Sequence, residues 1–180
     1  MFENKKWLII IAVVLIGIGL VFAVIKIKKE PPKQLSNFED CVLAGYPILE
    51  SYPRQCRTRN NEIFIEDIGN ELEKLNLIKL EQPRPNQIIS TPVLVKGEAK
   101  GYWFFEASFP IDITDSSGEI IGSGIAQAQS DWMVEDFVRF EAEINFSQPK
   151  IKTGYLILKK DNPSGLPEND DQLRIPVKFK

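Results

Sequence analysis

The chain has 180 residues, 26% of them charged and 10% aromatic, and it contains no histidine. This length suits one ordinary domain with accessory segments, and the composition suits a folded chain. Without histidine these residues cannot form a Ser-His-Asp or Cys-His catalytic group, and they lack the commonest metal ligand. Two cysteines are too few for a four-cysteine zinc site. We therefore expect no catalytic residues, no cofactor and no metal.

An uncharged apolar run extends from Trp7 to Ile25, with lysines on both sides. As a helix rising about 1.5 Å per residue, it would nearly match the ~30 Å hydrocarbon core of a bilayer. A cleaved signal peptide is the alternative, but the run is longer than the ~7–15 apolar residues usual there. The sequence thus predicts a cytoplasmic tail (1–6), a retained transmembrane helix (7–25) and a linker (26–35).

Beyond Lys29 the chain is acidic. Five of the 22 basic residues but only one of the 25 acidic residues precede Glu30, so the remainder carries a net charge of −7. Nucleic-acid binding requires clustered positive charge, which this part lacks. We expect no nucleic-acid partner, and contact with the membrane only through residues 7–25.

Residues 36–68 are predicted to form a small two-cysteine module. Ser36 and Glu39 have the spacing of a capping box for a short helix, and Gly45 is placed to end that helix. Two short strands should follow around a turn at residues 59–61. A connector over residues 69–76 would complete this part of the chain.

Cys41 and Cys56 could staple the helix to the first of these strands. The alternative is a pair of buried free thiols in a reducing compartment. A bridge over this loop would contribute about 3 kcal/mol, and a segment this small needs such a staple. Because a disulfide indicates an oxidising compartment, we expect a single-pass membrane protein with a cytoplasmic N-terminus and an extracytoplasmic body.

Residues 77–180 show the alternation of half-buried strands. Apolar residues occupy the even positions of 137–146 and the odd positions of 173–179. Gly122 and Gly124 suggest a bulge, and Pro176 suggests an edge strand. The pattern predicts an all-β, two-sheet immunoglobulin-like sandwich of seven or eight strands. These strands are expected near 78–81, 87–90, 93–99, 103–113, 119–128, 137–146, 154–160 and 173–179.

Four aromatic residues, Tyr102 to Phe105, stand at the start of the predicted 103–113 strand. Strand parity places Trp103 and Phe105 in the core with Phe109. It places Tyr102 and Phe104 on the outer face. The run is therefore predicted to be half core and half surface.

Strand direction brings three loops to one end of the sandwich. If successive strands run up and down, the loops 100–102, 129–136 and 161–171 converge, and such loops often carry recognition. The alternative is structural, because Trp132 and Met133 could plug the open end of the core. The candidate interaction surface comprises Tyr102, Phe104, Trp132, Met133, Glu135, Asp136, Leu166 and Glu168.

Two chemical alternatives use acidic residues near this end. Asp161, Glu168, Asp170 and Asp171 offer oxygen ligands for calcium, but their spacing matches no established calcium loop. Glu106 and Glu135 could form the carboxylate pair of a glycoside hydrolase, which requires a sugar-sized cleft. The sequence predicts no such cleft.

Several stretches are similar to a known family. "PNQIISTPVLVKGEAKGYWFFEASFPIDITDSSG", "WMVEDFVRF" and "LKKDNPSGLPEND" resemble the immunoglobulin-like domain of bacterial spore-germination proteins, which often accompanies the GerMN domain. The resemblance covers residues 77–180. It implies a non-catalytic domain of the bacterial cell envelope.

These observations predict a membrane-anchored binding or structural module that faces an envelope protein or the cell-wall glycan. An alternative is an inhibitor or regulator of an extracellular enzyme, such as a protease, acting through the same loops. A carboxylate-based hydrolase is the third possibility. The sequence leaves the oligomeric state and the partner's identity open.

Overall fold

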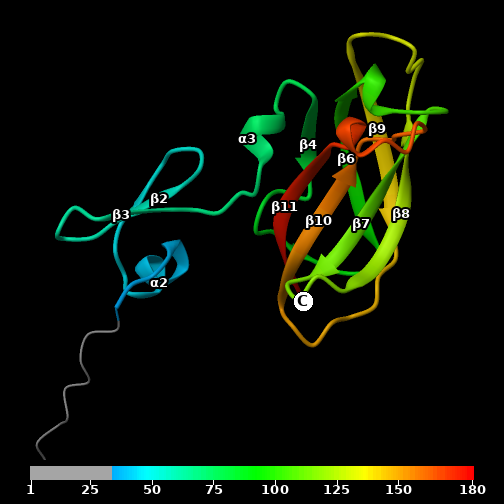
Figure 1. The fold of residues 1–180 in the computed structure, drawn as a ribbon. Coiled ribbons are helices and arrows are strands. Elements are labelled where there is room, and N and C mark those ends of the chain that lie inside the picture. The colour runs from blue at the N-terminus through cyan, green and yellow to red at the C-terminus, as the bar shows by residue number, and fades with distance from the viewer. Residues whose placement is uncertain (1–33) are drawn as a thin grey trace, which may run out of the picture. The chain divides into compact units, whose positions relative to one another are not determined.

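The computed structural model describes residues 34–180, which contain a small disulfide-bonded module and a β domain (Figure 1). Residues 37–180 form one compact unit. The predicted transmembrane helix and cytoplasmic tail lie outside the described residues. Within residues 34–180 there is no helix long and apolar enough to cross a membrane.

The two-cysteine module begins with helix α2 (Phe38–Leu43). Its N-cap is Asn37, whose side chain accepts a hydrogen bond from the backbone nitrogen of Asp40 at 2.8 Å. The predicted cap at Ser36 is thus wrong by one residue, because asparagine is an equally good cap and starts the helix later. Gly45 follows the helix with φ +79°, as its predicted role in ending the helix requires.

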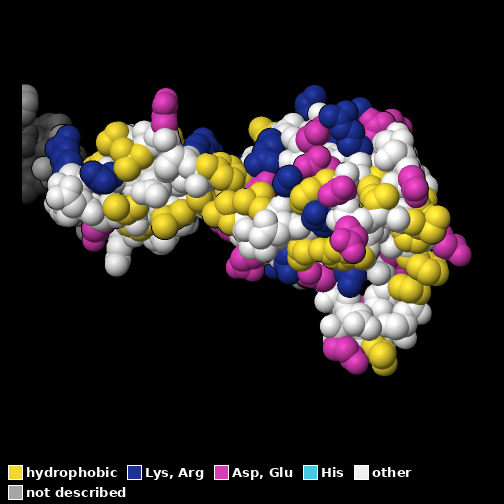
Figure 2. Space-filling view, turned by 90° about the horizontal axis from the view of Figure 1, so that it is seen from above, with side chains coloured by type: hydrophobic (Ala, Val, Ile, Leu, Met, Phe, Trp, Pro, Cys, Tyr) yellow, Lys and Arg dark blue, Asp and Glu magenta, His cyan; other side chains and the backbone are white. Residues whose placement is uncertain are grey.

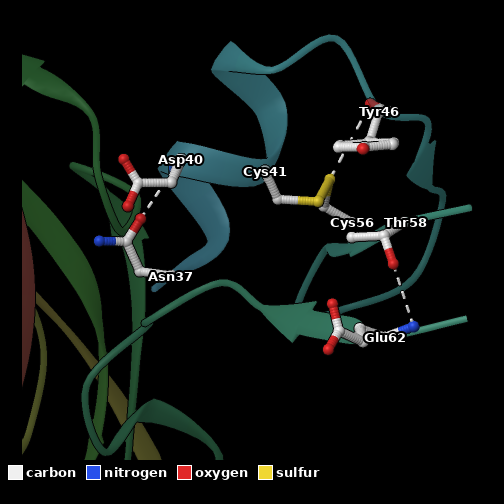
Figure 3. The surroundings of a disulfide bond; sticks show 7 residues. All are labelled: Asn37, Asp40, Cys41, Tyr46, Cys56, Thr58 and Glu62. Carbon is white, nitrogen blue, oxygen red and sulfur yellow. Dashed lines mark hydrogen bonds between the residues drawn. A yellow bond between two sulfur atoms is a disulfide. The ribbon is translucent and has the colours of Figure 1, made fainter. Parts of the chain in front are cut away.

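Three short antiparallel strands follow, in the order β1 (Ile48–Leu49), β2 (Gln55–Arg57) and β3 (Ile63–Ile65). The turn between β2 and β3 lies where it was predicted, whereas β1 carries no alternation long enough to be recognised in the sequence. The predicted disulfide is present. It joins Cys41 of α2 to Cys56 of β2 across a Cα–Cα distance of 6.1 Å, and both residues are fully buried (Figure 3).

All eight strands predicted for the β domain (residues 77–180) are present, preceded by the short helix α3. Hydrogen bonding orders them β4-β6-β9-β8-β7-β10-β11-β5. The bounds are α3 Glu71–Lys74, β4 Ile78–Gln82, β5 Ile88–Ile89, β6 Val93–Lys100, β7 Ser108–Asp115, β8 Ile120–Ala128, β9 Phe137–Ile144, β10 Thr153–Lys159 and β11 Gln172–Phe179.

The strands form one curled sheet, rather than the two separate sheets that the sequence predicted. One half of the sheet contains β4, β6 and β9, and the other contains β8, β7, β10, β11 and β5. The two halves are joined where β8 pairs with β9 over only two residue pairs, Gln127 with Glu141 and Ala128 with Phe140. Gly124 lies close to β9, since a Cβ at this position would be 2.9 Å from the side chain of Ile144. The missing side chain lets β8 bend towards β9, and this curling encloses the core in a sandwich-like manner.

Pro176 lies in the part of β11 that has a strand on one side only. Its strand β11 pairs with β10 along its whole length, and the two-residue strand β5 adds parallel pairs at Lys178 and Phe179. The edge assignment is therefore correct only for the first part of β11. The predicted bulge is present, because the register between β7 and β8 shifts between Ile113 and Thr114.

The run of four aromatic residues is not the start of a strand. Residues Gly101–Trp103 form a single 3-10 turn, and Glu106 and Ala107 have positive φ, so β7 begins only at Ser108. Trp103 is fully buried and Phe104 is 3% exposed, whereas Phe105 is 41% exposed. The predictions for Phe104 and Phe105 were wrong because strand parity does not apply before β7.

Polar side chains connect the two-cysteine module to the β domain. Arg84 forms an ion pair with the buried Glu71 at 2.7 Å and donates a hydrogen bond to the Tyr52 hydroxyl, also at 2.7 Å. Burial raises the pKa of Glu71, and the Arg84 guanidinium only partly offsets that rise. Within the module, Arg54 donates two hydrogen bonds, of 2.6 and 2.8 Å, to the buried Glu66.

We expect Glu66→Gln to lower the free energy of unfolding by about 1–2 kcal/mol at pH 7, because it removes a charge-assisted pair that is buried on one side. The Arg54 hydrogen bond lowers the pKa of Glu66. The Arg54–Glu66 pair therefore contributes its full stabilisation at pH values above the ordinary glutamate pKa. This stabilisation is lost as pH falls through the lowered pKa of Glu66. Urea unfolding of both proteins at pH 7 and near pH 3 should show a difference that shrinks in acid. An equal difference at both pH values would contradict this assignment.

Candidate functional site

Three loops meet at one end of the β domain, as the strand directions predict. The backbone nitrogen of Gly101 donates to the carbonyl of Asp136 at 3.2 Å, and that of Asp161 donates to the carbonyl of Trp103 at 3.0 Å. We call residues 100–103, 129–136 and 161–171 the three-loop end. In Figure 1 its green, yellow and orange-red segments lie together beyond the strands.

Gly101 fixes the spacing between the first two of these loops. A Cβ atom at this position would lie 1.9 Å from the carbonyl oxygen of Val134 and 2.3 Å from that of Trp132. Real contacts of this kind are never so short, so any side chain would push the two backbones apart. The loop that carries Met133 can therefore lie this close to the 100–103 loop only because residue 101 is glycine.

We expect Gly101→Ala to displace the 129–136 loop and to lower the free energy of unfolding by about 1–3 kcal/mol, as overpacking usually does. Amide chemical shifts of Trp132 to Asp136 would report the displacement. Gly118→Ala is a control in an open turn, where a Cβ would touch nothing within 4 Å although φ is +92°. It should affect its own turn only. Unchanged shifts in the 129–136 loop of Gly101→Ala would contradict the close approach.

The three-loop end exposes large apolar side chains. Met133 is 76% exposed, Tyr102 52% and Leu166 51%. Trp132 is half-buried and packs against the core, as expected of a residue that closes the open end of the core. Met133 does not have this structural role, because it is exposed. Glu135, Asp136 and Glu168 are exposed beside them. Figure 2 looks onto this end of the molecule and shows apolar side chains interspersed with acidic and basic ones.

Three residues at this end differ from the sequence prediction. Phe104 is buried and not part of the surface, because its ring packs edge-on against Phe109 at a centroid distance of 5.2 Å. Phe105 and Val134 belong to the exposed surface instead, since they are 41% and 40% exposed. The sequence held one usable signal for this exchange. Gly101 directly precedes the aromatic run, and glycine commonly interrupts a strand pattern.

A groove of about 660 Å³ lies beside this end, between α3 and the loop after β10. Two of its lysines form ion pairs: Lys74 with Asp171 and Lys159 with Asp112, each at 2.5 Å. Burial alone would raise the pKa of Asp112, but hydrogen bonds from Lys159 and Ser123 outweigh it and lower that pKa. The groove is lined by Asn70, Glu73, Lys74, Pro110, Lys159, Lys160, Asp161, Asn162, Asp170, Asp171 and Gln172.

Two of the four acidic residues of the 161–171 loop, Asp170 and Asp171, have partners within the protein. Asp170 accepts a hydrogen bond from the Asn162 amide at 2.7 Å, and Asp171 is bound by Lys74. Over residues 34–180, the structure brings no three metal-binding side chains together. Neither Glu106 nor Glu135 lines the groove. The arrangement therefore lends no support to the calcium or the hydrolase interpretation.

Comparison with known proteins identifies the β domain. Residues 77–165 match a family model described as the immunoglobulin-like domain of bacterial spore germination, Gmad2. Over these residues the chain is similar to the Gmad2 family. No curated protein and no solved structure matches the chain.

The Gmad2 match contains most of the three-loop end. It includes both the Gly101 turn and the 129–136 loop, and it ends at Gly165, within the third loop. Strand β11 and the two-cysteine module lie outside the matched residues. The matched residues thus include the close approach at Gly101 and the exposed Tyr102 and Met133, while Leu166 lies just beyond them.

Proposed function

We propose that this chain is a membrane-anchored binding module of a bacterial cell envelope, which presents the three-loop end of its Gmad2 domain to an envelope protein or to the cell-wall glycan. The observation that carries the proposal is the exposure of Tyr102, Met133 and Leu166 on three loops held together by backbone hydrogen bonds. Exposed apolar groups clustered on a rigid fold are typical of interaction sites.

The chemistry of the surface indicates what it could contact. Tyrosine offers a flat apolar ring with a polar tip, and methionine adapts to irregular shapes. The acids Glu135, Asp136 and Glu168 are exposed on the same loops. This combination of an apolar centre and a polar rim is common at non-obligate interfaces. It favours a partner with exposed apolar groups and basic or hydroxyl groups around them.

Two observations support an extracytoplasmic location for the body of the protein. The Cys41–Cys56 disulfide belongs in an oxidising compartment, and the Gmad2 match is to a domain of bacterial spore germination. Anchoring would be provided by the apolar residues 7–25, which lie outside the described part of the chain. The proposed topology has a cytoplasmic N-terminus and a single span.

The test is binding of the full chain, in neutral detergent, to envelope proteins and to purified cell-wall glycan. The double variant Tyr102→Ala, Met133→Ala should weaken the binding by tenfold or more, because it removes the exposed apolar centre. Ile120→Ala is a matched control, since Ile120 is 57% exposed and lies next to the hairpin turn that precedes β8. Binding unaffected by the double variant would contradict the proposal. Inhibition of a protease by the wild-type chain would instead favour the regulator alternative.

A further inference from the structure

Strand β3 is an edge strand whose outer backbone groups have no partner among the described residues. Its neighbour β2 pairs Cys56 with Phe64, and the flanking hydrogen bonds run from Glu66 to Arg54 at 2.9 Å and from Thr58 to Glu62 at 3.0 Å. Because antiparallel hydrogen bonding alternates along a strand, the N–H and C=O groups of Ile63 and Ile65 point away from β2.

The side chains of this edge are unusually apolar. Ile63 is 48% exposed and Ile65 is 60% exposed, on the sheet face opposite the one that carries Cys56. Proteins generally protect free edges with a proline, a bulge or an inward-pointing charge, because such edges pair readily with other strands. Ile63–Ile65 contains no proline, bulge or charge, so only its three-residue length limits such pairing.

The sequence of the edge reads the same in both directions: Glu62-Ile63-Phe64-Ile65-Glu66. In an antiparallel pair of two copies centred on Phe64, each Ile63 lies opposite the other copy's Ile65. These are the two residues whose backbone groups point outward, so the pairing forms four new hydrogen bonds and satisfies all of those groups. A two-fold symmetric interface requires this kind of self-complementarity.

Charge is compatible with this register. Glu62 lies opposite Glu66 of the second copy, and Glu66 is already bound by Arg54 through two hydrogen bonds. The Arg54 side chain is 51% exposed, which leaves its remaining N–H groups accessible to a second carboxylate. Arg54 can therefore bind Glu62 of the other copy as well as its own Glu66.

We propose that β3 is a contact surface for a second copy of this chain, in which two β3 strands pair antiparallel about Phe64 and join the two small sheets into one of six strands. The palindromic register favours a second copy over an unrelated extended peptide. The contact is short, and interfaces of such size are weak, so we expect a reversible dimer.

The test measures the mass of the full chain in neutral detergent by sedimentation equilibrium over a range of concentrations. Ile65→Pro removes an N–H that the strand β2 does not use, so it should spare the module but weaken association by tenfold or more. Ile65→Val keeps the N–H and should retain association. Ile125→Arg changes a side chain of similar exposure (53%) on β8 and should also retain it. A wild-type chain that stays monomeric up to about 100 µM, or a dimer that survives Ile65→Pro, overturns the proposal.

Hydrogen exchange of the wild-type chain provides a test that needs no variant. The amides of Ile63 and Ile65 should exchange at least tenfold more slowly in concentrated than in dilute solution, whereas that of Phe64, which faces β2, should change little. Exchange of Ile63 and Ile65 that is independent of concentration in an associating chain would place the contact elsewhere and overturn the proposal. Because this readout concerns β3 alone, its failure would leave the proposed function of the three-loop end untouched.

Discussion

Replacing Trp103 by alanine should lower the free energy of unfolding of the β domain by about 3–5 kcal/mol, the range for a large aromatic side chain removed from a core. Trp103 is fully buried, and its backbone carbonyl accepts the hydrogen bond from Asp161 that fixes the third loop. The cavity would therefore weaken the core directly beneath the three-loop end. Urea unfolding followed by circular dichroism measures the loss.

Trp103→Phe is the matched control. The indole nitrogen of Trp103 is buried and, within residues 34–180, has no hydrogen-bond partner. The change to phenylalanine thus loses part of the packing but no hydrogen bond. It also removes a buried N–H group whose desolvation no hydrogen bond offsets. We expect it to cost less than half as much as alanine. Equal costs for the two variants would contradict this expectation.

Removing the disulfide with Cys41→Ala, Cys56→Ala should destabilise the two-cysteine module by about 3 kcal/mol, the chain-entropy value for a bridge between residues fifteen positions apart. Few other apolar residues support this module: in residues 36–68 the buried hydrophobic residues besides the cysteines are Phe38 and Ile68. We expect the module to open while the β domain stays folded.

Amide hydrogen exchange distinguishes local from global loss. In the double variant, the amides of α2 and β2 should exchange much faster, and those of β7 and β10 should keep their protection. Reducing the wild-type bridge under native conditions should reproduce the pattern. Loss of protection throughout residues 37–180 would show that the module and the β domain unfold together, and that the disulfide supports both.

The strands of the β domain could be predicted because one face of each strand is buried. In β9 and β11 this alternation extends over eight residues, and it located both strands to within two residues. The disulfide could be predicted because a module of this size has little core of its own. The convergence of the three loops followed from strand direction alone, which does not depend on whether the strands form one sheet or two.

Other features depend on contacts that a pattern does not contain. Glu106 and Ala107 adopt positive φ, which sequence favours only weakly, and this turn exchanges the roles of Phe104 and Phe105. The two-residue pairing of β8 with β9 arises from the curvature of the whole sheet. Likewise Glu71, an acidic residue in a connector, is buried by Arg84 and Tyr52 from segments on either side in the sequence.

The measurement that tests the proposed binding surface most directly is site-specific photo-crosslinking of the full chain in the cell that produces it. Benzoylphenylalanine would replace Tyr102 in one protein and Ile120 in another, positions with 52% and 57% exposure. The account predicts that illumination links position 102 to one envelope protein or to the wall glycan, and that position 120 forms no such adduct. The absence of any adduct at position 102, or the same adduct from both positions, would contradict it.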